Sequence, residues 1–138
     1  MPVGTALLDR PTSTADRIGR GLLAVCAIAT VWAFANGILI MTRVSDERVI
    51  TEAWRTFAYV VFAGLWAMLA AGPRRQAGVW ELVLVQKAAI TVFALAALDL
   101  PDARMTALGD ASLVVATAVA YVLCRGWESW RPAAVSPR

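Results

Sequence analysis

The stretch GLLAVCAIATVWAFANGILIMT, residues 21–42, decides the fold of this chain. It contains no charged residue, and as an α-helix it would rise about 33 Å, enough to cross the hydrocarbon core of a bilayer. Arg17 and Arg20 precede this run and Ala33-Phe34-Ala35 lies within it, so a cleaved signal peptide is an alternative. The run continues past Ala35 to Thr42 without a charge, which favours a retained membrane helix.

Three further apolar stretches have the length of membrane spans. Residues 56–73 carry no charge, residues 76–98 carry Glu81 and Lys87, and residues 105–124 carry only Asp110. The whole chain is 59% hydrophobic and 17% charged, which is typical of an integral membrane protein rather than a soluble domain. We therefore predict an all-α fold, an integral membrane four-helix bundle over residues 19–126. Its expected spans are 20–42, 54–73, 78–98 and 106–125, between a disordered cytoplasmic tail at 1–18 and a second cytoplasmic tail at 127–138.

The arginines predict the orientation of these spans. One set lies before the first span, between the second and third, and after the fourth: Arg10, Arg17, Arg20, Arg74, Arg75, Arg125, Arg131 and Arg138. Because basic residues collect on the cytoplasmic side, we expect both termini in the cytoplasm of a bacterial-type plasma membrane. The net charge of +3 comes largely from these flanking arginines, so membrane lipid is an expected partner and nucleic acid is not.

The composition excludes several kinds of site. The chain has no histidine, so it cannot build bis-histidine haem ligation, an imidazole zinc site or histidine-based acid–base catalysis. Cys26 and Cys124 are far apart in the sequence and form no C-x-x-C motif, so we expect two free buried thiols. No cofactor and no metal site is identifiable.

Lys87 is the residue most indicative of function. It is expected about 16 Å from the outer end of its helix, where a lysine has an insertion penalty of about 2.5 to 3.5 kcal/mol. A buried partner, a water-filled cavity or a function is therefore expected, and Asp110 is the best counter-charge. Two interpretations stay open for Lys87, a structural ion pair and a ligand or proton site.

Asn36 extends this candidate ligand or proton path towards the outer leaflet. In the predicted spans it comes to a depth similar to that of Asp110, and the two would line a polar pocket that opens outward. Glu52 and Arg55 fall near the same depth. For these two residues a solvated rim is the favoured interpretation.

Glu81 lies six positions before Lys87, a spacing that turns it about 120° around the helix and leaves the two on adjacent walls of one cavity. The alternative places Glu81 at the membrane interface, paired with Arg74 or Arg75. Two tryptophans near mid-bilayer complete the candidate set, either as cavity walls or as space-filling residues: Trp32 and Trp66.

Arg17 and Arg20 lead into the first helix at Gly21, and Glu81 stands at the head of a later helix in a four-span layout. In these features the chain resembles the DoxX-like group of small bacterial membrane proteins. The resemblance implies an accessory membrane subunit linked to redox or quinone-related processes.

Three functions from different classes are consistent with these features. The first is an accessory or ligand-binding subunit of a membrane complex, with a membrane or cytoplasmic protein as partner. The alternative is a homo-oligomeric transporter of small molecules or ions, with a polar path around Lys87 and Asp110. An intramembrane enzyme is third, because Lys87, Glu81 and Asp110 would be its only acid–base groups.

Overall fold

The computed structural model describes residues 13–131, which form four α-helices, a short 3-10 helix and no strand. The elements are α1 (Ser13–Met41), α2 (Asp46–Ala71), α3 (Val79–Ala96), α4 (Ala103–Leu123) and η1 (Gly126–Trp130). All four α-helices are long and apolar enough to cross a membrane. The predicted all-α architecture of four such helices is therefore confirmed.

The helix boundaries differ from the predicted spans mainly at the starts of α1 and α2. α1 begins at Ser13 rather than at residue 20, and α2 begins at Asp46 rather than at residue 54. Residues 13–18 of the predicted disordered tail are therefore helical, and residues 127–130 of the second predicted tail belong to η1. The remaining residues of both predicted tails, 1–12 and 132–138, lie outside the described part of the chain. Asp46 extends α2 because a carboxylate in the first turn is favoured by the helix dipole.

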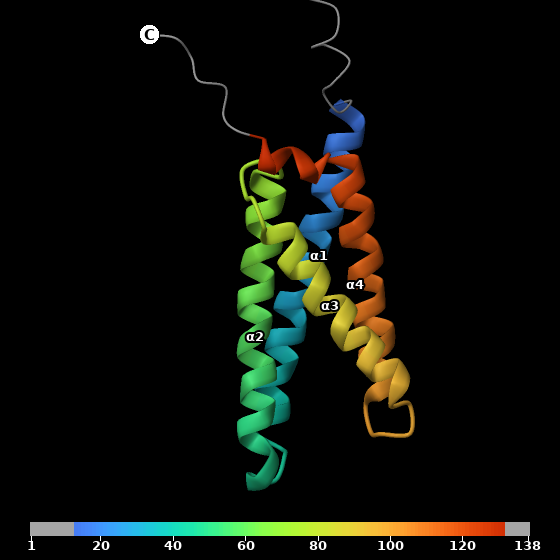
Figure 1. Cartoon of the computed structure of the whole chain (residues 1–138). Helices are drawn as coiled ribbons and strands as arrows, with labels where there is room; N and C mark the ends of the chain where they lie inside the picture. The colour runs from blue at the N-terminus through green and yellow to red at the C-terminus, as the bar shows by residue number, and fades with distance from the viewer. Residues whose placement is uncertain (1–12, 132–138) are drawn as a thin grey trace, which may run out of the picture.

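The chain folds as two antiparallel helical hairpins. α1 packs along the length of α2, and α3 lies along α4 (Figure 1). α1 also packs on α4, whereas α2 and α3 make few contacts although they follow one another in the sequence. We call the end where α1 begins and α4 ends the upper end, which also holds residues 72–78 and η1. The lower end holds residues 42–45 and 97–102, and towards it α3 diverges from α2 (Figure 1).

The buried residues recur mostly at intervals of three and four along the helices, the spacing of left-handed membrane bundles. On α1 the buried positions are Gly19, Leu23, Cys26, Thr30 and Gly37. The apolar core formed by these stripes lies in the upper half of the bundle and consists of Leu23, Cys26, Trp66, Leu69, Trp80, Val83, Ala120 and Cys124. Glu52 and Thr56 are buried in the lower half, and Lys87 is buried near the middle.

Two glycines allow α1 to approach its neighbours closely. A methyl group on Gly37 would overlap the side chain of Thr56 on α2, and one on Gly19 would lie 2.5 Å from the Cys124 sulfur. Small residues at helix crossings allow close backbone approach, which is the main source of helix association in lipid. These two contacts fix α1 against α2 near one end and against the end of α4 near the other.

Candidate functional site

A buried ion pair between α3 and α4 is the centre of the candidate site. The Nζ atom of Lys87 lies 2.7 Å from Oδ1 of Asp110, and the two side chains are only 7% and 17% exposed. Lys87 is in the middle of α3, so this is the contact that the sequence predicts for a lysine at that depth. At low dielectric such a pair is retained because each charge neutralises the other.

Aromatic rings of α2 form the wall opposite Asp110. The Lys87 ammonium group lies 4.3 Å from the centre of the Phe62 ring and 5.8 Å from that of Trp66. The fully buried Trp66 donates its indole N–H to the Thr117 hydroxyl on α4 at 3.0 Å. Lys87 therefore connects α3 to both α2 and α4, although α2 and α3 themselves make few contacts.

Tyr59 lies on α2 between the rings that contact this pair and the charged residues nearer the lower end. It lies one turn before Phe62 on α2 and is within electrostatic reach of Arg55, Asp110 and Glu52. The positions 52, 55, 59, 62 and 66 follow the spacing of one helix face. One face of α2 thus carries Glu52, Arg55 and Tyr59 towards the lower end, followed by the two rings that contact Lys87.

Glu52 is buried, so the predicted solvated rim is wrong for this residue. Only 4% of its surface is exposed, and its carboxylate is held between two arginines of its own helix. Arg55 Nη2 lies 2.5 Å from Oε2, and Arg48 Nη2 donates to Oε1 at 3.0 Å. Arg48 also approaches Asp102 at 4.0 Å, which links α2 to the loop before α4. These pairs satisfy the charge that burial would otherwise disfavour.

Two of the sequence candidates face away from the ion pair. Trp32 is 77% exposed and Asn36 is also exposed, so neither lines a site with Lys87. The buried stripe of α1 passes through Thr30 and Gly37 instead. This face of α1 points inward because Gly37 packs against Thr56 of α2. Trp66, by contrast, is inside the bundle as a wall of the site.

Glu81 belongs to a different part of the molecule from Lys87. Its Oε1 accepts a hydrogen bond at 3.0 Å from the indole N–H of Trp130 in η1. The expected pairing with Arg74 or Arg75 is absent among the described contacts of Glu81. Arg74 instead bonds to Asp16 at 2.6 Å and to the carbonyl oxygen of Cys124 at 2.8 Å. The sequence does not reveal this pairing because Asp16 lies far away in the chain.

The groups around Asp16 form a second charged cluster, at the upper end. The hydrogen bond to Asp16 raises the pKa of the Arg74 guanidinium, so this arginine stays charged. Arg20 lies 3.9 Å from the same carboxylate and donates to the carbonyl oxygens of Ala70 and Ala71, which end α2. The carbonyl oxygens in the last turn of a helix have no donor within that helix, and Arg20 supplies the donors for two of them.

Both cysteines are free and buried. Burial raises the pKa of the Cys124 thiol to about 11, because the charged thiolate is disfavoured away from water.

Within residues 13–131 no cluster of three or more cysteine, aspartate or glutamate side chains is placed to hold a metal ion. The site at Lys87 offers an ammonium group that donates hydrogen bonds and a carboxylate that accepts them.

Sequence reasoning missed Tyr59, Phe62 and Thr117. Tyr59 and Phe62 share one face of α2 with Glu52 and Trp66, and this spacing could have indicated that they face the site. The spacing points inward only if Glu52 is known to be buried. Thr117 lies on the buried stripe of α4, but α4 carries other small residues at similar spacing, so the sequence does not single out this threonine.

No protein-family model, curated protein or solved structure matches this chain.

Proposed function

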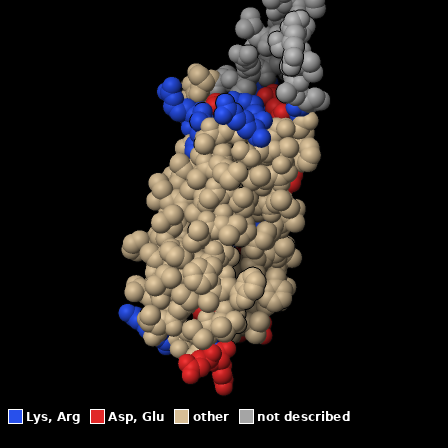
Figure 2. All heavy atoms as spheres, turned by 90° about the vertical axis from the view of Figure 1, so that its left-hand side faces the viewer, with Lys and Arg blue, Asp and Glu red and all other residues tan. Residues whose placement is uncertain are grey.

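We propose that this chain is a small multi-pass membrane protein in which each of α1 to α4 crosses the bilayer. The charged side chains support this proposal, because Figure 2 shows them at the two ends of the molecule with a broad uncharged band between. The shortest helix, α3, has 18 residues and rises about 27 Å, close to the thickness of a bilayer core. We place the upper end in the cytoplasm of a bacterial-type plasma membrane.

The charge difference between the ends supports this orientation. Within the described residues, the upper end carries Arg17, Arg20, Arg74, Arg75, Arg125 and Arg131 against Asp16, Glu81 and Glu128. The lower end carries Arg43, Arg48, Arg55 and Arg104 against Asp46, Glu47, Glu52, Asp99 and Asp102. An excess of arginine marks the cytoplasmic side of a membrane protein.

We propose further that the protein is an accessory or ligand-binding subunit of a membrane complex, in keeping with its resemblance to DoxX-like proteins. One observation supports this function: buried charged residues occupy the lower half and the middle of the bundle but not its apolar core. Glu52 is buried in the lower half and Lys87 near the middle, and the apolar core fills the bundle beyond Trp66. Buried charges that end inside the membrane are suited to bind a ligand or to hold helices together, rather than to conduct across.

Native mass spectrometry of the protein extracted in a mild detergent tests this function. It reports the number of subunits, retained small molecules and partner chains in one measurement. A stable hetero-complex or a retained small molecule is the expected result. The matched sample is Lys87→Met, which keeps the side-chain volume and removes the cation, and it should release a ligand held at Lys87. A clean homo-oligomer without ligand or partner would contradict the proposal.

A homo-oligomeric transporter is the second candidate function. The observation that favours it is the position of two ionised groups, Lys87 and Asp110, at mid-height of the helices, where charge is expensive. Most of the surface of each helix also faces outward, which leaves area for contacts between copies. Ion or proton flux into vesicles containing the protein, abolished by Asp110→Asn, would establish transport in place of the accessory role.

A further inference from the structure

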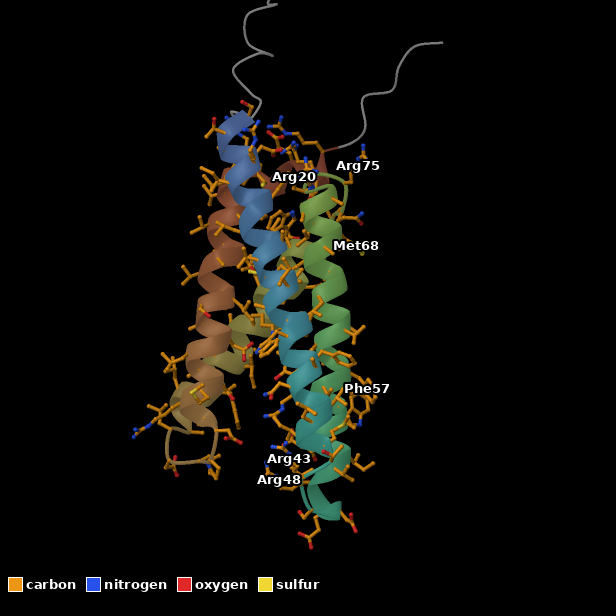
Figure 3. The ribbon with its side chains drawn as sticks, turned by 180° about the vertical axis from the view of Figure 1, so that it is seen from behind. Arg20, Arg43, Arg48, Phe57, Met68 and Arg75 are labelled. Carbon is orange, nitrogen blue, oxygen red and sulfur yellow. The ribbon has the colours of Figure 1, made fainter. Side chains whose placement is uncertain are left out.

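Two arginines at the upper end have no counter-ion among the described residues. Arg17 on α1 and Arg75 in the loop after α2 are both exposed, whereas Arg74 and Arg20 share Asp16. Arg20 and Arg75 lie near each other at the end of α2 (Figure 3), where the aliphatic part of Arg75 packs over Gly72. Arg17 is one turn from Arg20 on α1 and therefore extends the same face. We call Arg17, Arg20 and Arg75 the arginine rim.

Arg20 is held in place before any ligand arrives. Its Nε and Nη2 donate to the carbonyl oxygens of Ala70 and Ala71 at 2.6 and 3.0 Å. A guanidinium has five N–H donors, so this arginine retains donors for an external acceptor. Because its side chain is already ordered, little conformational entropy remains to be lost on binding.

An apolar helix surface lies directly beneath the arginine rim. Met68 and Phe57 are exposed on α2 below Arg75, as Figure 3 shows, and neither is covered by another helix. In Figure 2, basic side chains gather at the upper end above a broad uncharged face. A molecule that matches both parts has an anionic headgroup and long apolar chains.

We propose that the arginine rim binds the phosphate headgroup of an anionic phospholipid, whose acyl chains lie along the exposed face of α2. The proposal rests on the membrane position proposed above. It adds a lipid site that is independent of Lys87. Basic residues next to a membrane span attract anionic headgroups, with about a fivefold gain in binding for each lysine or arginine.

The test uses the full chain in nanodiscs made from phosphatidylglycerol and phosphatidylcholine, followed by release and native mass spectrometry. The wild type should retain phosphatidylglycerol in preference to phosphatidylcholine, and added salt should weaken this preference because charge attraction is screened. The double variant R17Q/R75Q leaves the Arg20 bonds intact and should lower the retention of phosphatidylglycerol by about 30-fold. Equal retention of the two lipids by the wild type would overturn the proposal.

A matched control removes the same charge at the other end. Arg43 and Arg104 are exposed and have no ion pair among the described contacts, so R43Q/R104Q should retain phosphatidylglycerol like the wild type. An equal loss in this control would show that net charge alone attracts the lipid, which would also overturn the proposal. So would displacement of phosphatidylglycerol by an equal concentration of inorganic phosphate, since the site would then recognise free phosphate. Failure to enter nanodiscs of either lipid would instead contradict the membrane position itself.

Discussion

The ammonium group of Lys87 lies 4.3 Å from the centre of the Phe62 ring, and this contact joins α3 to α2. Few other contacts hold these two helices together, although they are consecutive in the chain. A desolvated cation over an aromatic face is worth about 2 kcal/mol. The position of α2 against the second hairpin therefore depends on a charge as well as on apolar packing.

Replacing the Phe62 ring should weaken this connection. Phe62→Leu keeps an apolar side chain and removes the aromatic face, so we expect a loss of about 1 to 2 kcal/mol in stability. Thermal unfolding in mild detergent, followed by circular dichroism, measures the effect. Phe93→Leu, at an exposed position of α3, is the matched control and should change the stability little. Equal melting temperatures for the two variants would show that the ring position is unimportant.

The Lys87–Asp110 pair should respond to single and double replacement differently. Lys87→Met leaves an uncompensated buried carboxylate and should lower stability by about 3 kcal/mol. Adding Asp110→Leu removes both charges and should restore most of the loss, because an apolar pair can replace a buried ion pair. The wild type and the two variants are compared by thermal unfolding in one detergent. A single variant as stable as the wild type would show that the pair contributes nothing to folding.

The approach of α1 to α2 at Gly37 leaves no room for a side chain. Gly37→Ala should destabilise the bundle by about 1 to 3 kcal/mol, since the methyl group overlaps Thr56. Gly64→Ala is the control, because open space surrounds that glycine, and alanine should stabilise its helix by up to about 1 kcal/mol. Thr56→Ala should rescue the Gly37 variant. If the Gly37 and Gly64 variants unfold at the same temperature, the contact with Thr56 is not limiting.

Cys124 should react slowly with thiol reagents in the folded protein. Burial raises the pKa of its thiol from 9.0 to about 11, so at neutral pH the reactive thiolate should be about 100-fold rarer than for an unperturbed cysteine. Maleimide labelling of a Cys26→Ser variant measures this rate. Ser45→Cys, introduced at an exposed position into a variant lacking both native cysteines, gives the reference rate. Equal rates at the two positions would mean that Cys124 is accessible.

The four helices and the central ion pair could be predicted from the sequence, because each depends on a local signal. Long uncharged runs indicate helices of spanning length, and a lysine and an aspartate isolated in such runs need one another. The outward position of Trp32 could not be predicted, since α1 is apolar around most of its circumference. The four-residue spacing of Ala29, Ala33 and Gly37 indicates a contact ridge, yet Ala29 is exposed and only Gly37 of the three is fully buried.

The early start of α1 and the burial of Glu52 could not be predicted for a different reason. Asp16 is stabilised within α1 by Arg74, whose position depends on the turn between the two hairpins. Glu52 is buried between arginines that also look like rim residues in the sequence. The first contact joins segments that are distant in the sequence, and the second depends on which face of α2 points inward. The positions of charges along the chain predict neither of these.

The division into two hairpins keeps the central ion pair within one of them. Both members of the central ion pair lie on the second hairpin, Lys87 on α3 and Asp110 on α4. The counter-charge of the buried lysine is therefore supplied from within its own hairpin. Separating the two hairpins would therefore break the contacts of Lys87 with the rings of α2 but leave its ion pair in place.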